Sequence, residues 1–180
     1  MKDILKKTGG RRAACPKAIW SSGIYPIGVI YCAAGPRGLI ALWISPSLDD
    51  GAFVKRITGG GYEPVRDAVA LKKVFDWLDR YFAGLASPFP LPLDPQGTVF
   101  QKAVWKAIAA IPRGEVRSYS SIAAAIGRPK AARAVGGACA ANPIPVIVPC
   151  HRVISAGGEG GYTGGLHIKR ALLRLEGVRL

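Results

Sequence analysis

The chain has 180 residues, of which 49% are hydrophobic and 20% are charged. That balance excludes a disordered or fibrous protein, and the length suits one or two small domains with a buried core. Lysine and arginine number 25 against 11 acidic residues, and the resulting net charge of +14 favours a polyanionic partner such as nucleic acid. Between Thr98 and Val135 seven basic residues accompany a single acid, Glu115, so we expect this segment to face that partner.

Sequence features that the chain lacks exclude several further classes. Its apolar runs fall short of the roughly 18 residues that span a membrane, and its basic N-terminal arm leads into no apolar signal core. We therefore expect a soluble protein without membrane contact, in the cytoplasm of a prokaryote or the nucleus of a eukaryote. We also expect it to be a monomer in solution. The four cysteines form no C-x-x-C pair and only two histidines are present, so we expect no metal, no cofactor and no disulfide framework.

The first half of the chain has the pattern of a small α/β unit. β-rich apolar runs cover residues 23–32 and 38–45, and the Ala-Ala-Gly-Pro-Arg segment between them predicts a hairpin. Residues 53–57 predict one more short strand. From Pro64 onward apolar residues recur near helical spacing as far as Phe82, and Gly84 marks the expected end of that helix.

A proline-rich segment divides the chain. Residues 87–95 hold four prolines, too many for a helix or a central strand, and predict an extended connector. We place the domain boundary there, with an N-terminal α/β domain at residues 1–92 and a C-terminal domain at residues 93–180. The expected fold class is therefore α/β, in which an antiparallel sheet with a helix precedes a mostly helical domain with a helix-turn-helix.

Three helices are predicted in the second half, and they cover residues 97–111, 118–126 and 131–141. The Gly-Arg-Pro-Lys turn between the last two fits a helix-turn-helix. The third helix reads AARAVGGACAA, and with Arg133 as its one long polar side chain it suits shape-based DNA binding better than base reading. Its small residues would also suit packing against a neighbouring helix, so both interpretations stay open.

Cys150 follows an apolar run, residues 144–149, that predicts a short buried strand leading directly out of the core. Its neighbours are His151 and Arg152. A cationic or proton-accepting group beside a thiol lowers its pKa from about 8.5 toward neutrality, which favours a nucleophile. A buried cysteine is more often inert, and sequence neighbours need not point the same way, so this pattern alone leaves both interpretations open.

Several ordered motifs resemble those of the O6-alkylguanine-DNA alkyltransferases. The PCHRV motif around Cys150 is preceded by Asn142-Pro143 and followed by GYTGG from Gly161. The resemblance extends over residues 97–177 through GTVFQKAVW, IPRGEVRSYSSIA, RAVGGAC and LLRLEG, whereas the N-terminal half matches only in general layout. It implies direct-reversal repair, in which an alkyl group passes from O6-alkylguanine in double-stranded DNA to the protein's own cysteine. O4-alkylthymine is a further candidate substrate.

The resemblance also implies a role for each matching residue. Cys150 would attack the alkyl carbon, with His151 as its base through a bound water. Glu176 would orient the histidine, and Asn142 would support the Cys-His loop. The thioether product has no activated carbonyl for water to attack, so the protein would react once. The residues implied to line the pocket for the flipped base and its alkyl group are Tyr119, Pro145, Val153, Tyr162 and Thr163.

DNA contacts are implied on the helix-turn-helix. Arg133 would fill the gap left by the flipped guanine, whose unstacking otherwise costs a few kcal/mol. Tyr119 would crowd the phosphate to promote flipping and donate a hydrogen bond to guanine N3. The other residues implied at the DNA are Ala131, Ala132, Gly136, Arg128 and Lys130.

The chain departs from the family pattern at two points. Ala140 and Ala141 stand where some relatives carry a basic residue, so other basic residues would hold the phosphates: Arg128, Lys130, Lys102 or the N-terminal arm. The zinc ligands found in the N-terminal domain of some members cannot be assembled here.

Two other functions compete with repair. A noncovalent DNA-binding protein, either a regulator or a lesion sensor, would not need the reactive Cys150. A cysteine hydrolase would use a thiol, a histidine and an acid, but it would turn over many times and would not need Arg133 or Tyr119.

Overall fold

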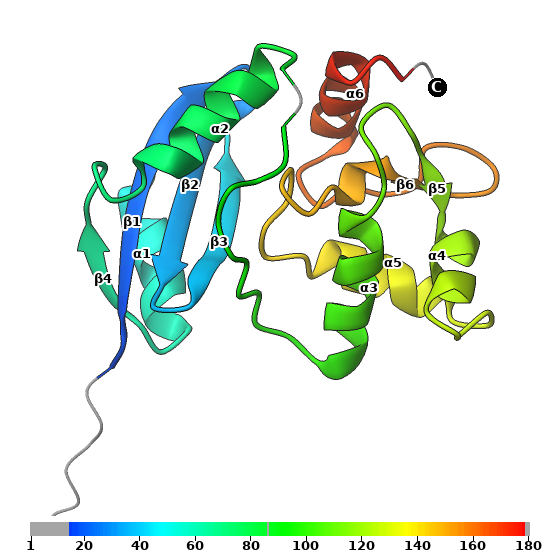
Figure 1. Ribbon diagram of the computed structural model, residues 1–180, viewed down its shortest axis with the longest axis horizontal. Coiled ribbons are helices and arrows are strands. Elements are labelled where there is room, and N and C mark those ends of the chain that lie inside the picture. The colour runs from blue at the N-terminus through cyan, green and yellow to red at the C-terminus, as the bar shows by residue number, and fades with distance from the viewer. Residues whose placement is uncertain (1–14, 86, 179–180) are drawn as a thin grey trace, which may run out of the picture.

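The computed structural model describes residues 15–85 and 87–178, and most of the predicted basic arm, residues 2–12, lies outside them. A four-stranded sheet with its helices forms one part of the molecule, and a group of helices beside the sheet forms the other (Figure 1). No helix within these described ranges is both long and apolar enough to cross a membrane.

The sheet has the order β3-β2-β1-β4. Its antiparallel strands are β1 (Lys17–Tyr25), β2 (Gly28–Gly35) and β3 (Gly38–Ser45), and β4 (Glu63–Arg66) lies parallel to β1. The hairpin predicted between residues 32 and 38 is confirmed. The single strand predicted over residues 23–32 is wrong, because the chain reverses at Pro26-Ile27, where Gly28 adopts a φ of 121° that suits glycine alone.

Residues 50–59 form a helix, α1 (Asp50–Gly59), so the strand predicted at residues 53–57 is wrong. Asp49 caps the helix by accepting a hydrogen bond from the Ala52 amide at 2.9 Å. Phe53 and Ile57 lie one turn apart and are both buried. A short apolar run fits both the two-residue repeat of a strand and the 3.6-residue repeat of a helix. Here the Asp49 cap and the burial of two side chains four positions apart favour the helix.

The helix predicted from Pro64 begins later in the structure. Val65 belongs to β4 and pairs with Ile19 of β1, while α2 covers Lys72–Phe82. Asp67 forms the turn between them, because its side chain accepts hydrogen bonds from two amides ahead of it. Buried residues of α1 and α2 belong to different clusters on the sheet, so the two helices cover opposite faces.

The three helices predicted in the second half are confirmed as α3 (Val99–Ala109), α4 (Tyr119–Ala125) and α5 (Ala132–Ala140). Thr98 and Gln101 form a reciprocal capping box on α3, and Ser118 caps α4. A parallel pair, β5 (Arg117–Ser118) with β6 (Val153–Ile154), ties the start of α4 to the segment after Cys150. The last helix is α6 (Leu166–Leu175).

The apolar segment before Cys150 is a series of turns, so the strand predicted at residues 144–149 is wrong. The Val148 amide donates to the Ile144 carbonyl at 2.9 Å, and Val146 has a φ of 74°. Prolines at positions 143, 145 and 149 lack the N–H that a strand ladder needs, while the alternate apolar side chains are buried. The turns lead into a single 3-10 turn, Cys150–Arg152.

One hydrophobic core runs through both parts of the molecule. The outer edge of β3 faces the connector and the second half, because the Leu39 amide donates to Pro92 O at 2.9 Å and the Leu42 amide to Pro143 O at 2.8 Å. Side chains of β3, α2, α3 and the segment before Cys150 join the same buried cluster. The domain boundary at residue 92 stays a prediction.

Candidate active site

Cys150 begins the 3-10 turn, and only 6% of its surface is exposed. The side-chain amide of Asn142 lies beside it, with Nδ2 3.2 Å from Cys150 Sγ and 2.8 Å from the Val148 carbonyl oxygen. Its Oδ1 accepts a hydrogen bond from the Ile144 amide at 3.0 Å, so the donor end of the side chain faces the sulfur. A donor at this distance stabilises the thiolate relative to the thiol.

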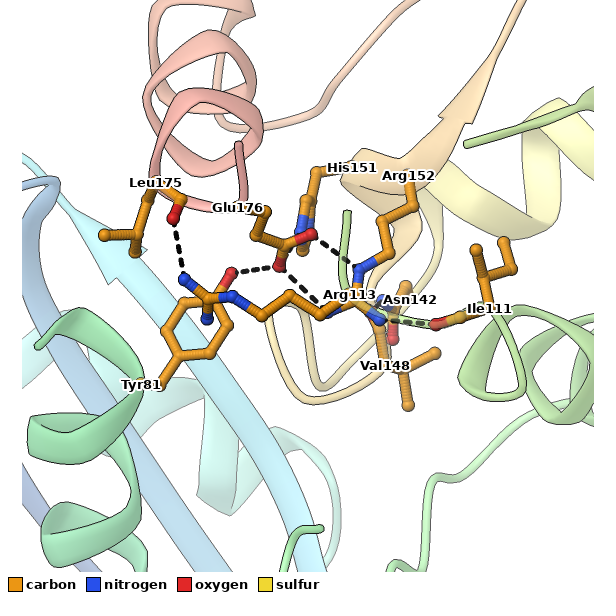
Figure 2. Close-up of polar contacts among 9 residues, drawn as sticks. All are labelled: Tyr81, Ile111, Arg113, Asn142, Val148, His151, Arg152, Leu175 and Glu176. Carbon is orange, nitrogen blue, oxygen red and sulfur yellow. Dashed lines mark hydrogen bonds and ion pairs between the residues drawn. The ribbon is translucent and has the colours of Figure 1, made fainter. Parts of the chain in front are cut away.

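His151 belongs to a buried polar network that Figure 2 shows. Its Nε2 lies 2.9 Å from Oε1 of Glu176, which follows α6. Arg152 binds both oxygens of that carboxylate, each at 2.8 Å. Tyr81 of α2 donates to Oε1 at 2.6 Å. The carboxylate is therefore held by Arg152 and Tyr81, and it holds the imidazole in turn.

The surroundings favour an ionised Glu176 beside a neutral His151. Burial alone would raise the pKa of Glu176, but hydrogen bonds from His151, Arg152 and Tyr81 outweigh burial and hold that pKa well below its usual range. Burial lowers the pKa of His151 despite the carboxylate. Within the described part of the chain, Nδ1 of His151 has no hydrogen-bond partner, so this nitrogen is available as a proton acceptor.

The Cys150 thiol experiences opposing effects. Burial raises the pKa of the thiol above its ordinary value, because it outweighs the hydrogen bond from Asn142 and the positive charge of Lys169, which lower that pKa. The lowered pKa that the neighbouring His151 and Arg152 favoured in the sequence is not found, since Arg152 binds Glu176 instead.

Lys169 of α6 is fully buried. Its Nζ donates to the carbonyl oxygens of Val153 at 2.7 Å, Glu159 at 2.5 Å and Gly161 at 3.4 Å. One lysine therefore fixes the loop after Cys150 and contributes positive charge to the site.

Two cavities meet at Cys150. The smaller, of about 280 Å³, is also lined by Tyr119 and Gly136 of the helix-turn-helix. The larger, of about 660 Å³, extends toward β3 and α1. Residues common to both cavities are Cys139, Ala140, Cys150, Tyr162 and Thr163.

Most of the residues predicted to bind substrate line these cavities. Tyr119 lines the smaller cavity, Pro145 lines the larger, and Tyr162 and Thr163 line both. Val153 is fully buried in the core and is not among the lining residues of either cavity. Its carbonyl group instead binds Lys169.

The residues predicted to contact DNA lie together on the helix-turn-helix. Arg133 is exposed on α5, and Arg128 and Lys130 are exposed in the turn before that helix. Half-buried neighbours on the same segment are Ala131, Ala132 and Gly136. Gly136 also lines the smaller cavity, so α5 contributes to both the predicted DNA surface and the pocket beside Cys150.

Comparison with known proteins assigns both halves of the chain to one family. A family model for the DNA binding domain of 6-O-methylguanine DNA methyltransferase matches residues 99–178, and a model for its ribonuclease-like domain matches residues 24–95. The chain belongs to the 6-O-methylguanine DNA methyltransferase family. This confirms the family predicted from the motifs around Cys150 and extends it to the N-terminal half.

Named relatives include two methylated-DNA–protein-cysteine methyltransferases. That of Mycobacterium tuberculosis strain H37Rv is 54% identical over 124 residues, which are 66% of this chain and 75% of the relative. That of Methanosarcina barkeri is 46% identical over 156 residues, which are 84% of this chain and 92% of the relative. The crystal structure of Mycobacterium tuberculosis OGT in complex with DNA matches with a TM-score of 0.75 and 43% identity, over 88% of this chain and 92% of that one. The predicted α/β fold class is thereby confirmed.

Two polar residues of this methyltransferase-family site were not predicted from the sequence. Tyr81 is 95 positions from its partner Glu176, and in sequence it reads as one more member of the apolar stripe of α2. Lys169 did give a signal, because it lies three and four positions before the buried Leu172 and Leu173, on the apolar face of α6. A lysine on the buried face of a helix needs hydrogen-bond acceptors around its ammonium group, because burying an unpaired charge is costly.

Arg113 was predicted to belong to the DNA-facing basic segment, but it turns inward. Its Nη2 donates to the Leu175 carbonyl oxygen at 2.6 Å, and its guanidinium lies 5.2 Å from the centre of the Tyr81 ring (Figure 2). Arg113 therefore supports the buried network behind His151.

Proposed function

We propose that this protein repairs DNA by direct reversal, transferring an alkyl group from O6 of guanine to Sγ of Cys150. The observation that carries the proposal is the arrangement around the sulfur: a buried thiol accepts a hydrogen bond from Asn142, next to a neutral His151 that is fixed by Glu176. The names of the relatives and a family structure in complex with DNA support the same function.

The chemistry is one displacement. The thiol proton passes through a water molecule to Nδ1 of His151, while the Glu176 carboxylate holds Nε2–H and stabilises the imidazolium that forms. The sulfur attacks the alkyl carbon, so the S–C bond forms as the C–O6 bond breaks. Guanine takes the electron pair, eased by a hydrogen bond from Tyr119 to N3, and gains a proton. The thioether is stable, so each chain reacts once.

The substrate is double-stranded DNA, and the damaged base leaves the stack to reach the smaller cavity. The small side chains of α5 allow close approach to the minor groove, where Arg133 occupies the gap and limits the cost of flipping. Arg128 and Lys130 hold phosphates at the turn. One chain supplies every group in this scheme, so the protein acts as a monomer with residues 93–180 carrying the chemistry.

A stoichiometric titration tests the function. Protein is incubated with an excess of duplex that carries one O6-methylguanine per molecule, and repaired duplex is counted at long times. We expect one repaired lesion per chain and a plateau that does not rise with time. Many turnovers would favour a hydrolytic enzyme instead, and binding to the lesion without repair would favour the noncovalent sensor.

A further inference from the structure

The turn that follows α3 contacts the network around Glu176 at several points. It consists of residues 111–114, and we call it the 111–114 turn. The Ile111 carbonyl oxygen accepts a hydrogen bond from Nη1 of Arg152 at 2.5 Å. Gly114 has a φ of 82°, and a Cβ on it would lie 3.3 Å from the carbonyl oxygen of Glu176. The 111–114 turn therefore packs against both Arg152 and the backbone of Glu176.

Arg113 extends from the 111–114 turn to two other parts of the network (Figure 2). Its Nη2 donates to the carbonyl oxygen of Leu175, the residue before Glu176, and its guanidinium lies over the Tyr81 ring. Tyr81 in turn donates to Oε1 of Glu176 at 2.6 Å. One side chain thus contacts both the ring that carries the donor and the backbone beside the acceptor. It therefore fixes how Tyr81 of the first half meets Glu176 of the second.

The positive charge of Arg113 is not used in an ion pair. Among residues 15–85 and 87–178 its guanidinium has no carboxylate within ion-pair distance, and its Nη1 is buried without a hydrogen-bond partner. A buried polar group of this kind costs free energy unless it serves another purpose. Burial raises the pKa of the Tyr81 hydroxyl, and the charge of Arg113 acts in the opposite direction. The cation therefore makes Tyr81 a stronger hydrogen-bond donor.

We propose that Arg113 is a positioning residue of the repair reaction, which acts on His151 through Tyr81 and Glu176. This rests on the proposed function and adds a residue to the machinery of the same site. Arg113 lines neither of the two cavities at Cys150, so its effect is indirect. It keeps the Tyr81 hydroxyl directed at Oε1 of Glu176, and that oxygen holds Nε2 of His151 at 2.9 Å.

Arg113→Met tests the proposal, because methionine fills part of the volume but carries neither a charge nor a donor. Single-turnover transfer from duplex O6-methylguanine is measured across pH. A weaker Tyr81 donor leaves the carboxylate to hold the imidazole proton more strongly, so the acidic limb of the rate profile should move upward. The limiting rate at neutral pH should fall about 2- to 10-fold, the range expected for loss of one cation–π contact.

The pH profile is specific because the other groups at the base are left in place. The charged and titratable side chains that face His151 and Glu176 are those of Tyr81, Arg152 and Lys169. Arg113→Lys keeps the charge and should recover part of the rate and of the profile, although an ammonium lacks the fork that reaches both contacts. Should Arg113→Met prove unfolded in thermal melts, Arg113→Gln, which removes the charge but keeps a donor, gives the same measurement.

DNA binding distinguishes this role from that of a phosphate contact. Arg113→Met should lower the limiting rate at saturating duplex and leave the half-saturating DNA concentration unchanged. Weaker DNA binding with an unchanged limiting rate would show that Arg113 holds a phosphate, and would overturn the proposal. Arg66→Met is the matched control, because Arg66 is exposed and its guanidinium lies 5.0 Å from the centre of the Trp20 ring, far from the site in the first half. It should change neither the rate nor the profile.

A double variant tests whether the effect passes through Tyr81. With Tyr81→Phe already in place, Arg113→Met should move the acidic limb less than it does alone, because the hydroxyl that it supports is gone. Full additivity of the two shifts, or an unmoved limb in Arg113→Met, would overturn the proposal. If the unmodified protein transfers no methyl group, the proposed function itself is wrong.

Discussion

Oε1 of Glu176 lies within hydrogen-bond distance of His151, Arg152 and Tyr81. In a buried site such a network couples its members, so removing one donor changes the proton affinity of the others. Tyr81 does not touch the reacting atoms, yet it shares the carboxylate that orients the base. We therefore expect Tyr81 to act as a positioning residue with an effect on the pKa of His151.

Tyr81→Phe tests that coupling through pH dependence. Burial lowers the pKa of His151, so the base stays neutral, and transfer should persist, as pH falls below about 6.5. Without the Tyr81 hydroxyl the carboxylate holds the imidazole proton more strongly, and the pKa of His151 rises. The acidic limb of the rate profile should move upward by about half a pH unit, since a hydrogen bond is worth about 1 kcal/mol.

The matched control for this profile is Tyr25→Phe. Tyr25 also donates to a carboxylate from the N-terminal half, that of Asp79 at 2.9 Å, but outside the site. Its loss should leave the profile in place. An unmoved acidic limb in Tyr81→Phe, or an equal shift in both variants, would contradict the coupling.

Lys169→Met tests the charge near the thiol. Methionine keeps much of the volume but removes the cation that lowers the pKa of Cys150 and the donor that binds three carbonyl groups. The pKa of Cys150 should rise, and its labelling by iodoacetamide at neutral pH should slow about threefold or more, which corresponds to half a pKa unit. Labelling is followed by mass spectrometry across pH, with the exposed Lys73→Met as control. Identical profiles for the two variants would count against the role of Lys169.

At the scale of helices and strands, the sequence predicted an element correctly wherever a capping or helix-breaking residue marks its end. The capping box at Thr98 and the cap at Ser118 place α3 and α4 where the sequence predicted them. The strands predicted at residues 53–57 and 144–149 were wrong, because a short apolar run fits a helix or a turn as well as a strand. At residues 53–57 the Asp49 cap decides for a helix, and at residues 144–149 the three prolines exclude a strand. The composition of α5 pointed to Arg133 as its surface contact, and the structure leaves this side chain, the only long polar one on the helix, exposed.

Arg133→Ala tests the role of α5 in flipping the base. Transfer from duplex DNA should slow by about tenfold or more, because unstacking costs a few kcal/mol and about 1.4 kcal/mol corresponds to tenfold. Transfer from free O6-benzylguanine should change little, since no duplex has to open. Arg80→Ala removes an equal charge from the exposed face of α2 and serves as the control. Equal losses on both substrates would indicate that Arg133 supports the fold instead.

At the scale of the whole molecule, the two halves are joined by a common core and by the site itself. The motifs of the second half predicted Cys150, His151, Asn142 and Glu176 as neighbours, and the structure brings them together. The contribution of the first half was not predictable, because Tyr81 of α2 meets Glu176 through packing between the two halves that leaves no local pattern in the sequence. The α/β layout and the connector at residues 87–95 were predicted from strand and proline patterns alone.

The fate of Cys150 tests the central claim most directly. The protein is incubated with duplex DNA containing O6-methylguanine, its intact mass is measured, and the modified peptide is sequenced by mass spectrometry. We predict a gain of one methyl group per chain, carried by Cys150 and absent from Cys150→Ser, with unmodified guanine restored in the DNA. An unchanged mass with the lesion intact, or a methyl group on Cys139 in place of Cys150, would contradict the account.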